Sequence, residues 1–470
     1  MKKITRIALL EPSVASECVV TELRCQIRTG APFIAGFLER KGYSARVFAE
    51  EIIEFTPQLL KEISENYDSV GISVALNTLI RGLQIAQILK RLKPDMPVSF
   101  GGASAAAFAD KLLVSSDAVF AGRAEKSFPL WIDSLNGCYE GEIPGIIVKN
   151  AVGIFRSDLP SETDDGLTRY DLVDSIGPFS VRNGLFGGPK PAIYSLFAST
   201  GCIRKCRFCK SPRNYVKRNL DNVTTDLEMI LKIHGNSSPV HVMLVDDCLF
   251  GDIEWTKELL RRIAHVSRNH SPRYSAQFHV QPTADNELMS LFRKAGFVSL
   301  AIGFESNFQK SLDGESKGTT ISQNDYAIEQ CRKYGIAPYG YFVAGFDTDT
   351  LESVSGIFDY IIDKKLIAQV LPVGIMNRDE NGNSTEDAGR VLSDTSFGAT
   401  VFVSHRPSLM KPSQLQAAIN AGYHRIAALS RIPRMLTTYE KMFQFGFNRC
   451  FNTWRPNMEA HVEWLKSRSL

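Results

Sequence analysis

The chain has 470 residues, of which 44% are hydrophobic and 22% are charged, and its formal net charge is +3. This length is too great for one ordinary hydrophobic core, so we expect two or three domains. Because the charge is nearly balanced and has no long run of one sign, the sequence gives no nucleic-acid footprint and favours a small-molecule or peptide substrate.

The N-terminal apolar stretch is too short for a signal peptide or a membrane span, and Glu11 and Pro12 interrupt it. We therefore expect no transmembrane segment and a cytoplasmic location. Nine cysteines are scattered along the chain, which indicates reduced thiols rather than a disulfide framework.

Residues 1–137 alternate short apolar runs with stretches of helical periodicity, which is typical of a parallel sheet wrapped by helices. We interpret them as an α/β domain of flavodoxin-like (Rossmann-like) order, in which ligands lie at the carboxyl ends of the strands. The expected strands are 4–10, 44–48, 69–74, 97–100 and 118–120, and the expected helices are 32–41, 79–92 and 126–135.

Two turns of this domain contain glycines where a strand is expected to end. Gly101 and Gly102 follow the fourth strand, and Gly122 and Glu125 belong to the turn after the fifth. Glycine allows a ligand or another backbone to come close. A tight strand-to-helix turn explains the same residues equally well, and both interpretations stay open.

Residues 138–191 are rich in glycine and proline and show little periodicity, so we expect a linker. Residues 192–395 are expected to form a partial (β/α)6 barrel with its active site at the carboxyl ends of the strands. Residues 396–470 are expected to form a helical C-terminal region. The expected barrel strands are 193–198, 240–245, 274–280, 297–303, 337–343 and 368–371, and the expected helices are 226–234, 253–269, 285–295, 322–334 and 350–364.

Cys202, Cys206 and Cys209 form a Cys-x3-Cys-x2-Cys triplet directly after the first expected strand of the barrel. Three thiolates on one loop can hold three irons of a four-iron, four-sulfur ([4Fe-4S]) cluster and leave the fourth iron without a protein ligand. A structural zinc site is the alternative, but it usually has four protein ligands, often in two separated cysteine pairs. The triplet therefore favours a cluster with one iron open to chemistry.

The triplet, Phe208 just before its last cysteine and the strand-like run 193–199 together resemble the signature of the radical S-adenosylmethionine (SAM) superfamily. This resemblance implies a radical SAM barrel in which SAM binds the open iron through its amino and carboxylate groups. One electron from the cluster would then cleave SAM to a 5′-deoxyadenosyl radical. An electron donor such as flavodoxin or ferredoxin is therefore expected as a partner.

Asp246 and Asp247 follow the second barrel strand, where relatives in this superfamily carry acidic or glycine-rich residues. The resemblance implies that they receive the ammonium group of SAM, to which a carboxylate makes charge-assisted hydrogen bonds. A pair of aspartates that caps a helix is the alternative. Cys248 comes next, and we expect it to pack in the core rather than to bind the cluster.

Gln277, His279 and Gln281 recur at period two on the third barrel strand, so all three are expected to face one side. A polar row inside a barrel needs partners or a ligand. Gln277 and His279 are therefore candidates for the adenosyl or substrate pocket. His279 is equally consistent with a buried histidine whose hydrogen bonds are satisfied within the protein.

Residues 303–306 read Gly-Phe-Glu-Ser and resemble the Gly-x-Glu-Ser segment of the superfamily. The resemblance implies that Glu305 and Ser306 lie at the ribose of SAM, as acidic residues do in nucleotide folds. A structural salt bridge is the alternative for Glu305. Gly345 begins a stretch that resembles Gly-x-Pro-Gly-x-Thr, although Asp-Thr replaces its Pro-Gly, and it implies a place for adenine near the backbone.

The two-domain order resembles the branch of the superfamily in which a cobalamin-binding-like domain precedes the radical SAM domain. On this resemblance Gly101, Gly102, Gly122 and Glu125 would lie against cobalamin. No Asp-x-His-x-x-G motif is present, and the first histidine of the chain is His234. Cobalamin would therefore be bound base-off and His-off.

The resemblance implies a class B (cobalamin-dependent) methyltransferase that acts on an unactivated carbon of a small-molecule or peptide substrate. Cobalamin would take a methyl group from one SAM, and the radical from a second SAM would activate the carbon that receives it. Three alternatives stay open: a cyclase or rearrangement enzyme with the same cofactors, a radical SAM enzyme whose N-terminal domain is a cobalamin-free docking module, and a non-enzymatic iron-sulfur sensor or binding protein.

Overall fold

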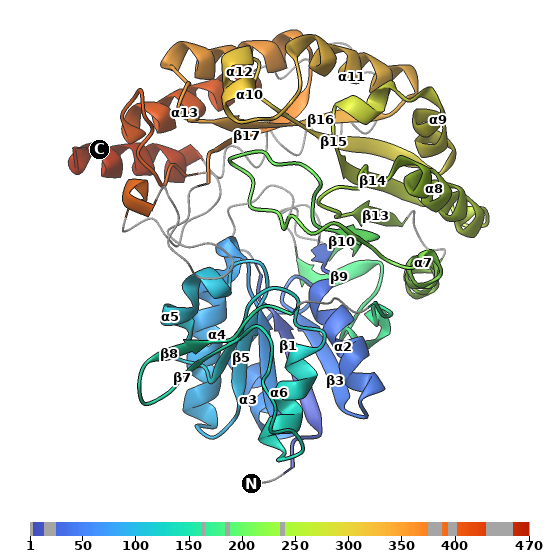
Figure 1. The fold of residues 1–470 in the computed structure, drawn as a ribbon, viewed down its shortest axis with the longest axis vertical. Helices are drawn as coiled ribbons and strands as arrows, with labels where there is room; N and C mark the ends of the chain where they lie inside the picture. The colour runs from blue at the N-terminus through green and yellow to red at the C-terminus, as the bar shows by residue number, and fades with distance from the viewer. Residues whose placement is uncertain are drawn as a thin grey trace. The chain divides into compact units, whose positions relative to one another are not determined.

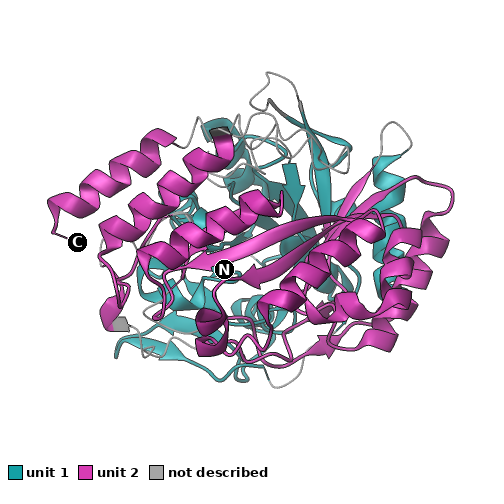
Figure 2. Ribbon diagram, turned by 90° about the horizontal axis from the view of Figure 1, so that it is seen from above, with its two compact units in different colours: residues 1–194, 221–237, 376–388 teal, residues 195–220, 238–375, 389–470 magenta. Residues whose placement is uncertain are grey.

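The computed structural model describes residues 3–13, 25–160, 165–183, 189–235, 240–374, 388–392, 402–428 and 455–469. The chain forms two compact units (Figure 2). The first comprises residues 1–194, 221–237 and 376–388, and the second comprises residues 195–220, 238–375 and 389–470. The first unit therefore continues beyond residue 137, where the N-terminal domain was expected to end.

The first unit is built on a sheet whose described strands have the order β3-β1-β4-β5-β6-β7-β8 (Figure 1). Its first five strands pair in parallel and lie in the buried core, which explains why each appears in the sequence as an apolar run. This order confirms the expected flavodoxin-like fold. The five strands are β1 (Arg6–Glu11), β3 (Ser44–Ala49), β4 (Ser69–Ser73), β5 (Val98–Gly101) and β6 (Ala118–Phe120).

Helices cover both faces of this sheet. α2 (Gly30–Arg40) contacts α6 (Ser127–Leu135), and α3 (Pro57–Asn66) contacts α4 (Leu79–Leu92). For this strand order the right-handed crossover rule puts α2 on one face and α3 and α4 on the other, and α6 contacts α2. α3 was not expected from the sequence, although Thr56 caps it by accepting a hydrogen bond from the backbone N–H of Leu59 at 3.2 Å.

Residues 138–191, expected to be a linker, contain three strands. β7 (Ile146–Lys149) pairs antiparallel with β6, and β8 (Ile154–Arg156) pairs antiparallel with β7, so both extend the first sheet. β9 (Phe179–Asn183) pairs antiparallel with the N-terminal part of β10 (Pro189–Leu196). The glycine and proline signals in this range mark turns between short strands.

The second sheet has the described strand order β17-β16-β15-β14-β13-β10-β2 and curls into a half-barrel (Figure 1). β13 to β17 pair in parallel, and β10 adjoins β13, which confirms the expected partial barrel of six strands. β2 (Cys25–Ile27) is too short to be expected from the sequence. The other strands are β10 (Pro189–Leu196), β13 (His241–Leu244), β14 (Arg273–Phe278), β15 (Phe297–Glu305), β16 (Ala337–Ala344) and β17 (Ile367–Pro372).

Helices alternate with the half-barrel strands as expected, and α13 (Pro412–Ala428) packs against the helix that precedes β17. Tyr423 ties α13 to β17, because its hydroxyl bonds both the N–H and the C=O of Val370, at 2.9 and 2.7 Å. Within the described chain, no helix has both the length and the apolar character to cross a membrane. The alternating helices are α8 (Ile253–Ser267), α9 (Asn286–Lys294), α11 (Ile321–Lys333) and α12 (Leu351–Asp363), while α7 (Leu220–His234) lies mostly in the first unit.

Candidate active site

The three cysteines lie on a loop that is closed at its base by a two-stranded ladder. β11 (Ser199–Thr200) pairs antiparallel with β12 (Val216–Lys217), so the loop begins and ends at the same place, directly after β10. Gly201 has a φ of 75°, and a Cβ there would lie only 2.1 Å from a backbone oxygen of the other limb. Glycine is therefore required where the loop opens.

Backbone and side-chain donors hold this cysteine loop in shape. The N–H of Arg204 donates to the sulfur of Cys202 at 3.4 Å, and the N–H of Ser211 donates to the sulfur of Cys209 at 3.5 Å. The guanidinium of Arg213 donates to the carbonyls of residues 204, 206 and 209. One arginine thus ties three carbonyls of the loop together, and sequence reasoning did not identify it.

The thiols differ in how readily they lose a proton. A hydrogen bond from Cys248, followed by the N–H of Arg204, lowers the pKa of Cys202 to about 6. Burial raises the pKa of Cys206, and the charge of Lys317 opposes that rise. Iron ligands must be thiolates, so N–H donors and cations around the sulfurs favour metal binding.

The loop fits a four-iron cluster by its donor set. Cys202 and Cys206 are buried and Cys209 is half-buried, so the three sulfurs are largely shielded from solvent. Among the described residues, no three His, Cys, Asp or Glu side chains converge on the position of a single metal ion. Each cysteine of a cluster needs to reach only its own iron.

The carboxylates of Asp246 and Asp247 accept hydrogen bonds from residues at the start of the cysteine loop. Asp246 is buried, and its carboxylate accepts the N–H groups of Ala198 and Ser199 as well as the hydroxyl of Ser199. Asp247 accepts the N–H of Gly201 at 3.1 Å. Burial raises the pKa of Asp246 to about 6, against these hydrogen bonds. Neither residue caps a helix, because α8 is capped by the aspartate at position 252.

The polar row expected on the third barrel strand is interrupted. β14 ends at Phe278, so of the row only Gln277 lies on the strand, whereas Gln281 begins a short 3-10 turn. Gln281 contacts the cysteine loop, because its amide oxygen accepts a hydrogen bond from Arg204 and its amide nitrogen donates to the carbonyl of Gly318 at 2.8 Å. The period-two argument therefore applies only up to the strand end, where the chain turns.

His279 is buried next to this loop and is neutral. Its ring lies 4.9 Å from that of Phe250, and its Nδ1 accepts the N–H of Gln281 at 3.3 Å. Burial, and then the charges of Lys317 and Arg204, lower the pKa of His279 to about 2. The proton is therefore assigned to Nε2, which has no partner among the described residues.

Glu305 forms a buried ion pair next to the cysteines. Its Oε1 lies 2.7 Å from Nζ of Lys317, and both side chains are largely inaccessible. The residue also has a φ of 64°, a backbone conformation that favours glycine. Ser306 is buried and accepts the N–H of Phe308 at 3.1 Å. Glu305 thus forms the salt bridge that was the alternative interpretation, and its role at the ribose of SAM stays a prediction.

The end of β16 reaches the cysteine loop through aromatic contact. The ring of Phe208 lies 5.3 Å from that of Phe346. Gly345 has a φ of 98°, and its N–H donates to Oδ2 of Asp349 at 2.9 Å. The structure thus brings Phe208 and the glycine turn after β16 to the same end of the half-barrel as Cys206 and Glu305.

The residues predicted for cobalamin lie at the carboxyl edge of the first sheet. Gly102 has a φ of 101°, and its Cβ would lie 2.5 Å from the carbonyl oxygen of Val74. A Cβ at Gly101 would meet nothing within 4 Å. Gly122 has a φ of 66°, and Glu125 is buried in an ion pair with Arg123 at 2.7 Å. The tight-turn interpretation therefore accounts for Gly102, while Gly101 leaves space beside the backbone.

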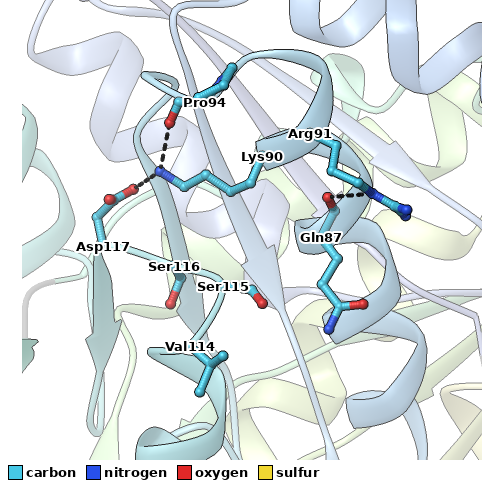
Figure 3. A pocket seen from close by; sticks show the side chains of 8 residues that line it. All are labelled: Gln87, Lys90, Arg91, Pro94, Val114, Ser115, Ser116 and Asp117. Carbon is cyan, nitrogen blue, oxygen red and sulfur yellow. Dashed lines mark hydrogen bonds and ion pairs between the residues drawn. The ribbon is translucent and has the colours of Figure 1, made fainter.

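A pocket lies at the opposite, amino edge of the first sheet (Figure 3). It is lined by the last turns of α4 and by the segment before β6. Lys90 crosses it and donates to Oδ2 of Asp117 at 2.7 Å. None of the predicted site residues lines this pocket, so we assign it no part in the chemistry.

Residues 196–361 match the family model of the Radical SAM superfamily. This range begins at the last residue of β10, includes the whole cysteine loop and ends within α12. It therefore contains every site residue predicted for the barrel.

The chain also resembles whole proteins over long stretches. It is 23% identical to the cytidylyl-2-hydroxyethylphosphonate methyltransferase of Streptomyces wedmorensis, over 72% of this chain and 73% of that protein. It is 25% identical to the anaerobic magnesium-protoporphyrin IX monomethyl ester cyclase of Rubrivivax gelatinosus, over 68% of this chain and 59% of that protein. It is 26% identical to the bacteriochlorophyllide d C-12(1)-methyltransferase of Chlorobaculum tepidum, over 48% of this chain and 50% of that protein. The chain thus spans less than two thirds of the last two relatives.

Two solved structures share the fold over almost the whole chain. The radical SAM methyltransferase TsrM of Kitasatospora setae, with cobalamin and a [4Fe-4S] cluster bound, has a TM-score of 0.68 at 15% identity and covers 99% of this chain and 100% of its own. The cobalamin-dependent SAM radical enzyme OxsB, with aqua-cobalamin bound, has a TM-score of 0.65 at 14% identity and covers 99% and 72%. Both likenesses span the N-terminal sheet as well as the half-barrel.

Proposed function

We propose that this chain, a radical SAM protein by residues 196–361, is a class B methyltransferase that uses cobalamin to methylate an unactivated carbon of a small-molecule or peptide substrate. The observation that carries the proposal is the three-cysteine loop at the carboxyl edge of the half-barrel, in a chain whose first unit has the fold present in cobalamin-dependent enzymes. Relatives named methyltransferases, from Streptomyces wedmorensis and Chlorobaculum tepidum, support it.

The chain's own residues have separable tasks in this proposal. Cys202, Cys206 and Cys209 hold three irons of the cluster, and Arg213 keeps the loop carbonyls in place. When bound, the cluster, SAM and cobalamin supply a 5′-deoxyadenosyl radical and a transferable methyl group. Such a transfer requires that both groups reach one substrate.

Of the two aspartates after β13, we propose Asp247 for the ammonium group of SAM. The carboxylate of Asp246 is buried and taken up by residues 198–199. Asp247 is exposed, and from the described residues it accepts two hydrogen bonds, at 3.1 Å from Gly201 and 3.0 Å from Ser211. A carboxylate offers about four lone-pair positions, so Asp247 retains capacity for a cation.

The neutral His279 and the glycine turn after β16 complete the proposed SAM pocket. The Nε2–H of His279 is a buried donor that a ligand acceptor would satisfy, which removes the cost of leaving it unpaired. Gln277, Glu305, Ser306 and Gly345 are proposed for the adenosyl part. For cobalamin, bound base-off and His-off, we propose the carboxyl edge of the first sheet, at residues 101–102 and 122–125.

The proposal is tested on protein purified anaerobically, by measuring iron and cobalt per chain. The protein is then incubated with SAM, candidate substrates and either flavodoxin or ferredoxin, which we propose as electron donors. Methylation requires both 5′-deoxyadenosine and S-adenosylhomocysteine among the products. The Cys206→Ala variant serves as the control and should form neither 5′-deoxyadenosine nor methylated substrate, because both require the radical. Absence of 5′-deoxyadenosine from the reduced wild type would leave a sensor or binding protein.

A cyclase or rearrangement enzyme is the second candidate, because relatives from Rubrivivax gelatinosus and Cereibacter sphaeroides are named cyclases. It predicts 5′-deoxyadenosine and cobalt without S-adenosylhomocysteine. A cobalamin-free docking module in the first unit predicts 5′-deoxyadenosine without bound cobalt. The same product assay therefore separates all three.

A further inference from the structure

The cysteine loop concentrates positive charge. Residues 201–219 contain seven Lys or Arg residues and no Asp or Glu, whereas the whole chain has 54 Lys and Arg against 51 Asp and Glu. The seven are Arg204, Lys205, Arg207, Lys210, Arg213, Lys217 and Arg218. The loop that holds the three cysteines is therefore cationic within a chain whose charge is nearly balanced.

Four of these cations are engaged within the protein. Arg213 donates to three carbonyls of the loop, and Arg204 donates to the side chain of Gln281. Arg218 is buried and donates to the carbonyl of Phe197 at 2.9 Å. The fourth, at position 217, forms an ion pair at 2.6 Å with the aspartate at position 252. These four side chains serve the structure of the loop and its surroundings.

The other three cations are exposed and stand next to the cluster ligands. Lys205 and Arg207 flank Cys206 on either side, and Lys210 follows Cys209 directly. Neither lysine forms an ion pair with another described residue. Cys209 is only half-buried, so it is the least covered of the three ligands. Free positive charge therefore lies at the outer side of the loop, one residue from two of its ligands.

An exposed apolar side chain belongs to the same stretch. Ile203 is 51% exposed, and it lies within the same eight residues as the three exposed cations. We call Ile203, Lys205, Arg207 and Lys210 the basic loop surface. Exposed apolar area bordered by charged side chains is typical of a protein–protein contact with a polar rim.

The carboxylates close to this surface have other partners. Asp347, whose charge acts on Arg207, forms an ion pair with Arg390 at 2.8 Å and accepts the hydroxyl of Ser408 at 2.6 Å. Asp247 accepts hydrogen bonds from the loop and is proposed above for the ammonium group of SAM. The exposed lysines thus retain their charge for a partner outside the chain.

We propose that the basic loop surface is the docking site of an acidic one-electron carrier protein that reduces the cluster. This inference rests on the proposed function, because such a carrier is needed only if the three cysteines hold a cluster. One electron leaves the carrier, which is oxidised, and enters the cluster, which is reduced, and no atom is transferred. A carrier bound here contacts the loop that bears the iron ligands.

The exposure of the cations favours a protein partner over a small anion. A small anion is usually held by converging, largely buried donors, whereas exposed charges of one sign steer the encounter with an oppositely charged protein. Such steering raises the association rate and weakens with ionic strength. Redox complexes also have small interfaces, below about 1,200 Å², so four side chains can form a substantial part of one.

The experiment measures the Kd of the full-length, anaerobically reconstituted chain for an acidic flavodoxin at ~0.1 M and ~1 M salt, between which the Debye length falls from about 10 to 3 Å. The loop variant combines Lys205→Glu and Lys210→Glu. The matched control combines Lys294→Glu and Lys333→Glu, which make the same change in net charge. Both control lysines are exposed and end α9 and α11, at the amino edge of the half-barrel.

At ~0.1 M salt the Kd of the loop variant should rise by about tenfold or more, while that of the control should stay within about twofold of the wild type. At ~1 M salt the wild type and the loop variant should converge. Formation of 5′-deoxyadenosine should slow in the loop variant with flavodoxin as the reductant. It should not slow with dithionite, a small reductant that needs no docking surface.

An unchanged Kd in the loop variant would overturn the inference, and so would an equal rise in the control, which would reduce the effect to net charge. If the loop variant loses iron, the same comparison is made with Lys205→Gln combined with Lys210→Gln, for which a rise of about threefold is expected. A wild type that binds flavodoxin through this surface but forms no 5′-deoxyadenosine with either reductant would instead refute the proposed function.

Discussion

The carboxyl edges of the two sheets are built in different ways. In the second unit the edge consists of buried side chains that bond one another, such as Asp246 with the cysteine loop and Glu305 with Lys317. In the first unit the edge is shaped by backbone turns at Gly102 and Gly122, both with positive φ. The cysteine motif therefore identifies the chemistry at the carboxyl edge of the second sheet. At the carboxyl edge of the first sheet, the backbone conformation of the glycine turns is what the sequence specifies.

The first edge also has buried carboxylates, and Glu50 and Glu51 are each paired with a cation of the same unit. Glu50 forms a bidentate pair with Arg81 and accepts the N–H of Ser13 at 2.9 Å. Glu51 pairs with Lys190 at 3.2 Å. These buried pairs hold the ends of β1 and β3 and the start of α4 together, so they serve the architecture of the edge.

The largest effect is expected at the cysteines. Replacing Cys202, Cys206 or Cys209 individually with alanine should abolish the cluster absorbance and the formation of 5′-deoxyadenosine, because each holds one iron. Iron analysis and optical spectra check this, with Cys331→Ala as the control. Full iron content in any one of the three variants would contradict the assigned ligand set.

The buried ion pair should give the next largest effect. Glu305→Gln or Lys317→Met alone leaves one buried charge without its partner, so we expect a loss of about 3–5 kcal/mol in the free energy of unfolding. The double variant should recover much of that loss. SAM affinity, measured by equilibrium dialysis, then sharpens the assignment: a double variant that is stable and binds SAM normally would make Glu305 purely structural.

The glycines of the first edge offer a matched pair. Gly102→Ala places a Cβ against the carbonyl of Val74 at a φ that alanine avoids, so it should cost about 3 kcal/mol of stability and reduce cobalt loading. Gly101→Ala meets open space, so its cost in stability should be below about 1 kcal/mol. Chemical denaturation of both variants checks the difference, and equal losses would contradict the backbone explanation.

His279 should give a pH effect of about 2 kcal/mol. Its folded pKa of about 2 lies below the ordinary 6.5, so the unfolded chain binds the proton more tightly. The stability from neutral His279 is present above pH 6.5 and is lost as the pH falls, by about 2 kcal/mol at pH 5. Denaturation at pH 7 and pH 5 checks this against His279→Phe, whose decline over that range should be smaller by that amount. An equal decline in both proteins would contradict it.

Apart from β2, the parallel strands were predicted to within a few residues. Those of the first unit are continuous apolar runs, whereas the half-barrel strands β14, β16 and β17 alternate buried and partly exposed residues. The prediction was incomplete where strands are short. β2 has three residues, and β7 and β8 lie within a stretch whose glycines and prolines indicate a linker equally well. β2 exists because Cys25 pairs with the distant Ala192, which leaves no local pattern, whereas β7 and β8 pair with each other across residues 150–153.

The cysteine loop was predictable because its chemistry depends on spacing within eight residues. The groups that support the loop were not predictable: the contacts of Arg213 with the carbonyls of residues 204, 206 and 209 follow from the shape of the folded loop, and the hydrogen bond from Gly201 to Asp247 depends on how distant segments meet. The predicted row on the third strand extended too far, because the chain turns after Phe278. Local spacing therefore located the ligands, and only the fold revealed the groups that surround them.

The ladder between β11 and β12 has a consequence for how the protein matures. Because four paired residues and Gly201 close the loop from within the chain, its ends are already fixed before any iron arrives. Less conformational entropy is then lost when a carrier delivers a cluster, so the cluster should bind to a loop whose shape is already set. Newly synthesised chains would consequently reach the loaded state without first refolding.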